Sequence, residues 1–303
     1  VVAIYRWDIK RLQALQEPGQ YLEVDVGQAA QPGDSGAVND FKLYLVQEFC
    51  NTTLGAVIRT QMLHNADGVI NELLLTFILD LVQGLEYLHD KGIIHGDLKP
   101  DNVLLKPDKG CMLGIVAKLT DFGLAVALNP AATHASGFKG GTPFYVAPEV
   151  VGEGRLTRAS DVFALGVMMW CLLAGEDPWV EGPDGALHRN PRFPRLPSAT
   201  PPAYARLMKR CVQRSPPSRP TAADVARGLT LLCEEIGLPL EAPSASSLPA
   251  SQPVLGLHSS TGAGGSVWAG GQREAATGPA HITAGHSSSL PVPGFRLESV
   301  EEV

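Results

Sequence analysis

An ordered series of three short motifs in the middle of the chain constrains its fold more than any other feature. The run His-Gly-Asp-Leu-Lys-Pro-Asp-Asn spans residues 95–102, Asp-Phe-Gly follows at 121–123, and Ala-Pro-Glu at 147–149. Any one of these motifs occurs by chance in unrelated proteins. Together and in this order, they predict a fold that brings separate polar loops to one site.

The series resembles the catalytic loop, the metal-binding loop and the end of the activation segment of eukaryotic protein kinases, which read H-R-D-x-x-x-x-N, D-F-G and A-P-E. The resemblance covers about residues 41–236. It implies an α+β fold of the bilobal protein-kinase type, mostly the helical large lobe with an incomplete small-lobe sheet. It also implies transfer of the γ-phosphoryl group of ATP to Ser or Thr hydroxyls of a protein substrate.

The resemblance assigns a role to each polar residue of these loops. Asp97 is predicted to accept the proton of the substrate hydroxyl, and Lys99 to bind and neutralise the transferred phosphoryl group. Asn102 and Asp121 are predicted to bind Mg²⁺ and the nucleotide phosphates, because Mg²⁺ prefers oxygen ligands. Leu104 is expected to lie in the apolar floor beneath adenine. Asp97 and Lys99 are therefore the predicted catalytic residues.

Residues 43–50 resemble the last small-lobe strand as it runs into the kinase hinge, with Gln47 at the gatekeeper position. By this resemblance, the carbonyl of Glu48 and the backbone N–H and carbonyl of Cys50 bind the adenine ring. The alternative for this stretch is an ordinary edge strand followed by a cysteine in the core.

Three further residues shape the expected surroundings of the catalytic loop. Thr142 is expected to bridge Asp97 and Lys99, which in the family is typical of Ser/Thr acceptors. Glu149 should pair with Arg219, because a buried carboxylate needs a fixed partner.

His95 is expected to stack on Phe122 as a core residue and not to act as a base, and Asp161 to hold the backbone of the catalytic loop. Gly96 occupies the position where most family members have an arginine that clamps a phosphate on the activation segment, here residues 123–141. Since glycine cannot do this, we expect activity that does not require phosphorylation of that segment.

Apolar residues at helical spacing predict helices at 71–89, 162–174, 203–211 and 221–235. Asn71 is a predicted N-cap, Gly92 a stop signal, and Thr221 with Asp224 a capping box. Ser160 and Asp161 are expected to open the second of these helices. Residues 176–202 are rich in proline and predict irregular structure.

Residues 1–5 predict a buried strand, which can be either the fourth or the third strand of a kinase small lobe. The first alternative is favoured, because the second requires the αC helix to fit within residues 10–17, barely two turns. Residues 6–9, and Lys10 after them, then leave the strand for an insertion at 17–40, in which 21–26 form a short strand. In both alternatives no lysine occupies the position of the ATP-binding lysine.

This pattern predicts three parts: a small-lobe remnant with the hinge at 1–50, a large lobe at 51–237, and a tail at 238–303 that is too poor in bulky apolar residues to order. We expect a kinase truncated at its N-terminus, without the glycine-rich loop, the ATP-binding lysine and the αC glutamate. The chain as given would then be inactive. The alternative is a pseudokinase-like module that binds partners without catalysis.

The composition and charge of the chain exclude some classes of binding partner. A formal net charge of −7 without a basic run argues against binding to nucleic acid or to anionic membranes. The most apolar run, 162–175, is too short to span a bilayer. Five cysteines without C-x-x-C spacing predict reduced core thiols in a cytoplasmic protein. Nothing in the sequence indicates an oligomeric state.

Overall fold

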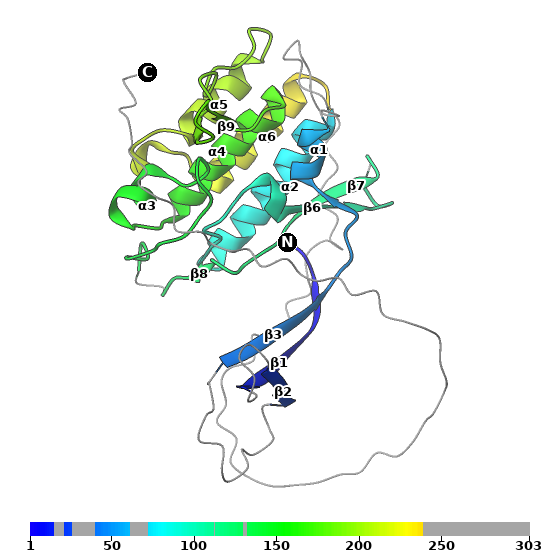
Figure 1. Ribbon diagram of the computed structural model, residues 1–303. Helices are drawn as coiled ribbons and strands as arrows, with labels where there is room; N and C mark the ends of the chain where they lie inside the picture. Colours follow the sequence, from blue (N-terminus) through cyan, green and yellow to red (C-terminus); the bar gives the residue numbers. More distant parts are fainter. Residues whose placement is uncertain (15–20, 26–39, 61–71, 112, 130–131, 239–303) are drawn as a thin grey trace. The chain divides into compact units, whose positions relative to one another are not determined.

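The computed structural model describes residues 1–14, 21–25, 40–60, 72–111, 113–129 and 132–238 (Figure 1). Within these residues every strand pair is antiparallel, and helices outnumber strands along the second half of the chain. This confirms the predicted α+β class. Among the described helices, none is both long and apolar enough to cross a membrane. Residues 239–303 of the predicted tail, the predicted cap Asn71 and most of the insertion predicted at 17–40 lie outside the described residues.

The N-terminal sheet has the order β2-β1-β3 and consists of β1 (Ile4–Ala14), β2 (Tyr21–Asp25) and β3 (Asp40–Gln47). The prediction of a buried first strand that ends at residue 5 was wrong, because Ile4 and Tyr5 are exposed and the strand continues to Ala14. β1 pairs with β3 from Ile4 opposite Gln47 to Leu12 opposite Asp40, and with β2 over residues 10–14. Pairing with β3 over residues 6–12 and with β2 over residues 10–14 therefore keeps this stretch extended, and the short strand predicted at 21–26 provides the second partner.

The long β1 strand also separates the two alternatives for the N-terminus. The placement as third strand requires a helix within residues 10–17, but residues 10–14 are strand. The structure thus favours the fourth-strand placement, in which β1 and the hinge strand β3 are direct neighbours. Lys10 does not leave the strand as predicted, but lies within it and pairs with Asp8 at 3.2 Å.

The helical part contains the core. Its helices are α1 (Leu54–Arg59), α2 (Glu72–Asp90), α3 (Pro148–Glu153), α4 (Arg158–Ala174), α5 (Pro202–Cys211) and α6 (Ala222–Glu235), with 3-10 turns at Pro100–Asn102 and Pro216–Ser218. α2 packs against α4 and α6, and α4 against α5 (Figure 1). Every residue of α4 from Ser160 to Leu173 is buried, which confirms the prediction of a central buried helix.

Capping residues explain where two helices begin. α4 begins at Arg158, one turn before the predicted start, because Thr157 is its N-cap and forms a capping box with Ser160. Asp161 consequently lies in the first turn of the helix. The predicted capping box of Thr221 and Asp224 is present at the start of α6.

Two small sheets frame the polar loops. One has the order β4-β6-β7 and consists of β4 (Thr52–Thr53), β6 (Val103–Pro107) and β7 (Ile115–Leu119); the other pairs β5 (Ile93–Ile94) with β8 (Val126–Ala127). Residues 95–102 connect β5 to β6, and Asp121 follows β7 directly. The sheets therefore bring the first two motifs side by side.

Two sequence-based expectations need correction. Residues 176–202 are not irregular throughout, because β9 (Trp179–Glu181) pairs with β10 (Leu187–Arg189) in a hairpin. All five cysteines are free as expected, but Cys50 and Cys111 are only half-buried, whereas the other three lie in the core. The spacing of cysteines in the sequence does not predict how deeply each side chain is buried, because burial depends on the residues that pack around it.

Candidate active site

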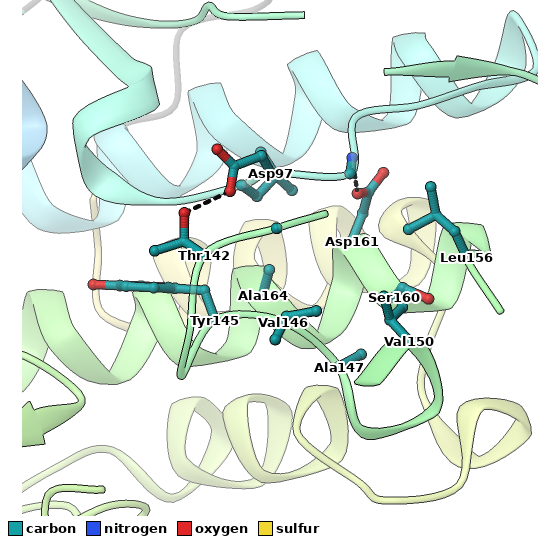
Figure 2. A pocket seen from close by; sticks show the side chains of 13 residues that line it. Asp97, Thr142, Tyr145, Val146, Ala147, Val150, Leu156, Ser160, Asp161 and Ala164 are labelled. Atoms are coloured by element: carbon teal, nitrogen blue, oxygen red, sulfur yellow. Dashed lines mark hydrogen bonds between the residues drawn. The ribbon is translucent and has the colours of Figure 1, made fainter. Parts of the chain in front are cut away.

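Asp97 lies at the centre of a compact polar cluster on the loop between β5 and β6. The Oγ1 of Thr142 donates to Asp97 Oδ1 over 2.6 Å (Figure 2). The Nζ of Lys99 donates to the same Thr142 oxygen at 2.9 Å and lies 3.0 Å from Asp97 Oδ2. The threonine hydroxyl thus donates to the carboxylate and accepts from the ammonium group, which fixes all three side chains. This confirms the predicted bridge between Asp97 and Lys99.

Asn102 is attached to the same carboxylate from the other side. Its Nδ2 donates to the backbone oxygen of Asp97 at 2.8 Å and to Asp97 Oδ2 at 3.1 Å. These two bonds use both hydrogens of the amide nitrogen, so the amide oxygen is the atom that can face a cation. The backbone oxygen of Asn102 accepts from the N–H of Thr120 at 3.1 Å, which places Asp121 beside it.

Asp121 is exposed and has a φ of 61°, a left-handed conformation that aspartate tolerates better than most residues. Its Oδ1 accepts from the N–H of Gly123 at 3.3 Å. One exposed carboxylate beside one amide oxygen fits Mg²⁺, which is usually held by one or two carboxylates and takes its other ligands from water and phosphate. Among the described residues there is no group of three or more His, Cys, Asp and Glu side chains that could hold a metal without such help.

The catalytic loop rests on Asp161 of α4, a residue that is 2% exposed. Asp161 accepts from the backbone N–H of His95 at 2.9 Å and of Gly96 at 3.0 Å, and it lies 2.9 Å from Nε2 of His89. These bonds confirm the predicted role in holding the loop backbone. The buried helix α4 therefore fixes the position of the loop backbone at His95 and Gly96, and with it the position of Asp97, the next residue.

His95 is buried and packs as predicted. Its ring centroid lies 5.2 Å from that of Phe122, and its Nε2 is 3.0 Å from the backbone oxygen of Thr120. This contact joins the catalytic loop to the segment that carries Asp121.

The predicted pair of Glu149 and Arg219 is present and bidentate, with distances of 2.7 and 2.8 Å. Ser160 also donates to Glu149 at 2.9 Å. Burial alone would raise the pKa of Glu149, but the bonds from Arg219 and Ser160 hold it below its ordinary value. The pair ties the start of α3 to the turn before α6 and is structural.

The hinge residue Glu48 has side-chain partners that the sequence did not predict. Its carboxylate accepts from Lys106 and Lys118, each at 2.7 Å, and from the N–H of Ala3 at 2.8 Å, and the residue is 4% exposed. Burial would raise the pKa of Glu48, but the two lysines and the amide outweigh it and lower the pKa to about 2. The sequence did contain one indication of buried acidic partners, because each of the apolar strands β6 and β7 carries a lysine.

The other predicted nucleotide contacts lie close to this network. Asn51 donates its N–H to the backbone oxygen of Leu105 at 3.0 Å, so the hinge runs alongside β6, where Leu104 is half-buried. Cys50 is half-buried, and burial raises the pKa of its thiol. It therefore does not match the alternative of a cysteine in the core.

A small cavity lies behind the catalytic loop (Figure 2). Its volume is about 10 Å³, which leaves room for one water molecule at most. It is lined by the backs of Gly96, Asp97 and Leu98, by Thr142 and the residues that lead into α3, and by the first turns of α4. The cavity is thus a packing gap beneath the site and too small for a substrate.

The arrangement can orient a hydroxyl at Asp97, hold anionic charge at Lys99 and bind a hard cation at Asn102 and Asp121. The fold and the arrangement of these residues are those of the protein kinase class. The family model described as "protein kinase domain" matches residues 35–228, and the chain belongs to the protein kinase family.

Several serine/threonine kinases are similar to the chain. The serine/threonine-protein kinase PkaA of Streptomyces coelicolor is 40% identical over 162 residues, which is 52% of this chain and 29% of that protein. The serine/threonine-protein kinase STY17 of Arabidopsis thaliana is 32% identical over 201 residues, 64% of this chain and 33% of that protein. The serine/threonine/tyrosine-protein kinase HT1 of the same plant is 35% identical over 176 residues, 56% of this chain and 43% of that protein. The chain spans less than half the length of these relatives.

Proposed function

We propose that this chain transfers the γ-phosphoryl group of ATP to Ser or Thr hydroxyls of a protein substrate. The observation that carries the proposal is the bridge of Thr142 between Asp97 and Lys99, which holds a proton acceptor and a cation 3.0 Å apart. Family membership and the names of the relatives support ATP as the phosphoryl donor.

In the proposed reaction, Asp97 orients the acceptor hydroxyl and takes its proton. The hydroxyl oxygen forms a bond to the γ-phosphorus while the bond from that phosphorus to the oxygen bridging it to the β-phosphorus breaks. Lys99 neutralises charge on the moving group, and the backbone at Glu48 and Cys50 with Leu104 would hold the adenine. Asn102 and Asp121 would hold Mg²⁺, which would neutralise further charge on the phosphates. A carboxylate has about four lone-pair sites, so Asp97 can accept the substrate hydroxyl in addition to its present partners.

The substitution Asp97→Asn tests this role in the natural protein that carries these residues. It keeps the size of the side chain but removes the proton acceptor, so we expect phosphate transfer to fall by about 10²–10⁴, the range for a positioned acid–base group. The matched control is Asp90→Asn, at an exposed position at the end of α2, which should keep the parent rate. The readout is incorporation of phosphate into peptide arrays with Ser, Thr or Tyr acceptors. Phosphorylation confined to tyrosine, or an Asp97→Asn variant as active as the control, would contradict the proposal.

The second candidate is an interaction module without catalysis. One observation favours it: the 303 residues contain no G-x-G-x-x-G motif. Calorimetry with ATP and Mg²⁺ separates the two functions. Tight binding that Asp121→Asn abolishes supports the enzyme, whereas no binding in the natural protein supports the module.

A further inference from the structure

Gly96 lies where the chain leaves no room for a side chain. The residue has a φ of 80°, and its N–H donates to Asp161 at 3.0 Å. A Cβ atom built on it would lie 2.8 Å from the backbone oxygen of Leu124 and 3.2 Å from Cζ of Phe138. The first contact is with backbone and cannot be relieved by a rotamer change. The activation segment therefore comes closer to the catalytic loop here than an arginine would allow.

The ring of Phe138 fills the space beside this glycine. The same ring faces Gly140, where a Cβ would lie 3.0 Å from Cζ and 3.2 Å from Cε1 of Phe138, and 3.1 Å from Cδ1 of Leu124. Phe138 is partly buried and packs against the main core. We call Gly96, Leu124, Phe138 and Gly140 the Phe138 cluster. Both glycines lie next to Cζ of this ring, so the close approach depends on the absence of a side chain at each of them.

The segment that carries Phe138 is also held from the opposite side. The N–H of Phe138 donates to the backbone oxygen of Gly154 at 3.0 Å. Ala135 and Leu156 form a β-bridge in which each N–H donates to the oxygen of the other at 2.9 Å. Phe138 is thus fixed between the turn after α3 and the catalytic loop.

The Phe138 cluster leads directly to the catalytic bridge. Gly141 has a φ of 98°, and a Cβ on it would lie 3.4 Å from the backbone oxygen of Gly96. The next residue, Thr142, donates to Asp97 at 2.6 Å and accepts from Lys99 at 2.9 Å. The stretch from Phe138 to Thr142 therefore lies along the catalytic loop, with the ring at one end and the threonine hydroxyl at the other.

We propose that Phe138 is a positioning residue for the phosphotransfer: its ring, seated on Gly96 and Gly140, holds Thr142 against Asp97 and Lys99 without any phosphate on the activation segment. This inference rests on the proposed function. The apolar contact takes the place of the clamp between an arginine and a phosphate that the family resemblance leads one to expect at position 96. Because an apolar contact carries no charge, ionic strength screens it little, unlike an ion-pair clamp.

The test compares Phe138→Ala, Phe138→Leu and the control Lys139→Ala, an exposed neighbour on the same segment. In the natural protein, Phe138→Ala should lower kcat about tenfold or more, because local opening then competes with the ordered segment. The KM for ATP should stay within about twofold, since the substitution leaves the proposed adenine contacts at Glu48 and Cys50 and the proposed Mg²⁺ ligands Asn102 and Asp121 unchanged. Phe138→Leu should recover most of kcat, because it restores apolar contact with the two glycines. A purely structural role would instead lower the amount of folded protein and leave kcat per folded molecule unchanged.

Hydrogen exchange gives a readout that does not need activity. Phe138→Ala should speed exchange of the amides of residues 139–146 about tenfold and leave those of α2 and α4 unchanged. If these amides exchange as in the parent, the inference is overturned, even where the protein proves active. If they exchange faster but no variant, the parent included, transfers phosphate, the positioning role holds and the proposed function fails. A parent enzyme that loses activity a hundredfold on phosphatase treatment would also overturn the inference.

Discussion

Glu48 shows at the scale of a single residue how one carboxylate connects distant segments. It accepts from Ala3, Lys106 and Lys118, residues from the N-terminal stretch, from β6 and from β7. The N–H of Glu48 in turn donates to the backbone oxygen of Ala3 at 3.0 Å. The ionised side chain therefore holds the start of the hinge against β6, which follows Asn102, and against β7, which precedes Asp121.

The first prediction concerns the pH dependence of stability. The folded pKa of Glu48 is about 2, against an ordinary value of 4.5. A depressed carboxyl pKa contributes stability that is fully present above the unfolded pKa and is lost as the pH falls from about 4.5 toward about 2. The variant Glu48→Gln cannot titrate, so its deficit in the free energy of unfolding should be largest at neutral pH. That deficit should shrink by up to about 3 kcal/mol on acidification.

Denaturant unfolding at pH 7, 4 and 3 on both proteins measures this difference. Other titrating groups, such as the half-buried Asp80, are present in both proteins, so most of their contribution cancels in the comparison. Glu235→Gln, at an exposed position at the end of α6, is the matched control and should differ little from the parent at any pH. A deficit of Glu48→Gln that stays constant from pH 7 to pH 3 would show that the two lysines do not stabilise the ionised form.

At the scale of the element, the activation segment is the part whose order decides whether the site is assembled. It comprises residues 123–141, and it is held by the bridge of Ala135 with Leu156 and by the Phe138 cluster. The hydroxyls of Thr133 and Ser136 lie at exposed positions on this segment. Neither the backbone bridge nor the apolar cluster involves these hydroxyls.

The second prediction is that phosphorylation of these hydroxyls is not required. Because Gly96 cannot bind a phosphate as an arginine would, the double variant Thr133→Ala, Ser136→Ala should keep a turnover within about threefold of the parent. Steady-state phosphate transfer by the natural protein measures this, with mass spectrometry to confirm the state of the segment. A hundredfold loss that Thr133→Glu or Ser136→Glu restores would refute it.

For the whole molecule, the N-terminal sheet differs in kind from the helical part. The helical part has a large buried core around α4, whereas β1 and β3 expose large apolar side chains, among them Tyr5 at 69%, Trp7 at 65% and Leu43 at 57%. Exposed apolar surface of this kind favours association with other surfaces. In neither placement of the first strand does a lysine occupy the position of the lysine that binds the α- and β-phosphates in a kinase, and Lys106 and Lys118 are both paired with Glu48.

The third prediction is that the 303-residue chain by itself transfers phosphate poorly, although its catalytic loop is assembled. Productive alignment of reactants can supply about 7–11 kcal/mol of a barrier, and a triphosphate held at one end only loses much of it. Transfer of labelled phosphate from ATP to a generic basic protein, together with calorimetry of ATP and Mg²⁺ binding, measures this on the purified chain. Robust turnover that Asp121→Asn abolishes would show that the prediction is wrong.

The sequence by itself determined the local features of this protein, namely its short motifs, its helix caps and the burial of its central helix. The catalytic motifs, the buried character of α4, the capping box of α6 and the pair of Glu149 with Arg219 could all be predicted from residue types and spacing. Helix periodicity and capping depend on residues close together in the sequence, and the three motifs follow a known family pattern. α4 begins one turn before its predicted start. The cause is a local one, the capping box that Thr157 forms with Ser160.

Only the tertiary structure decided the remaining features. The length of β1 depends on two pairing partners that come later in the chain, and the side-chain partners of Glu48 lie 45 to 70 positions away. The contact of Phe138 with Gly96 joins the activation segment to the catalytic loop. The bridge of Ala135 with Leu156 positions the first of these, and Asp161 positions the second. Contacts of this kind carry no periodic signal, because they depend on how separately formed elements pack, and that packing is settled by the buried core as a whole.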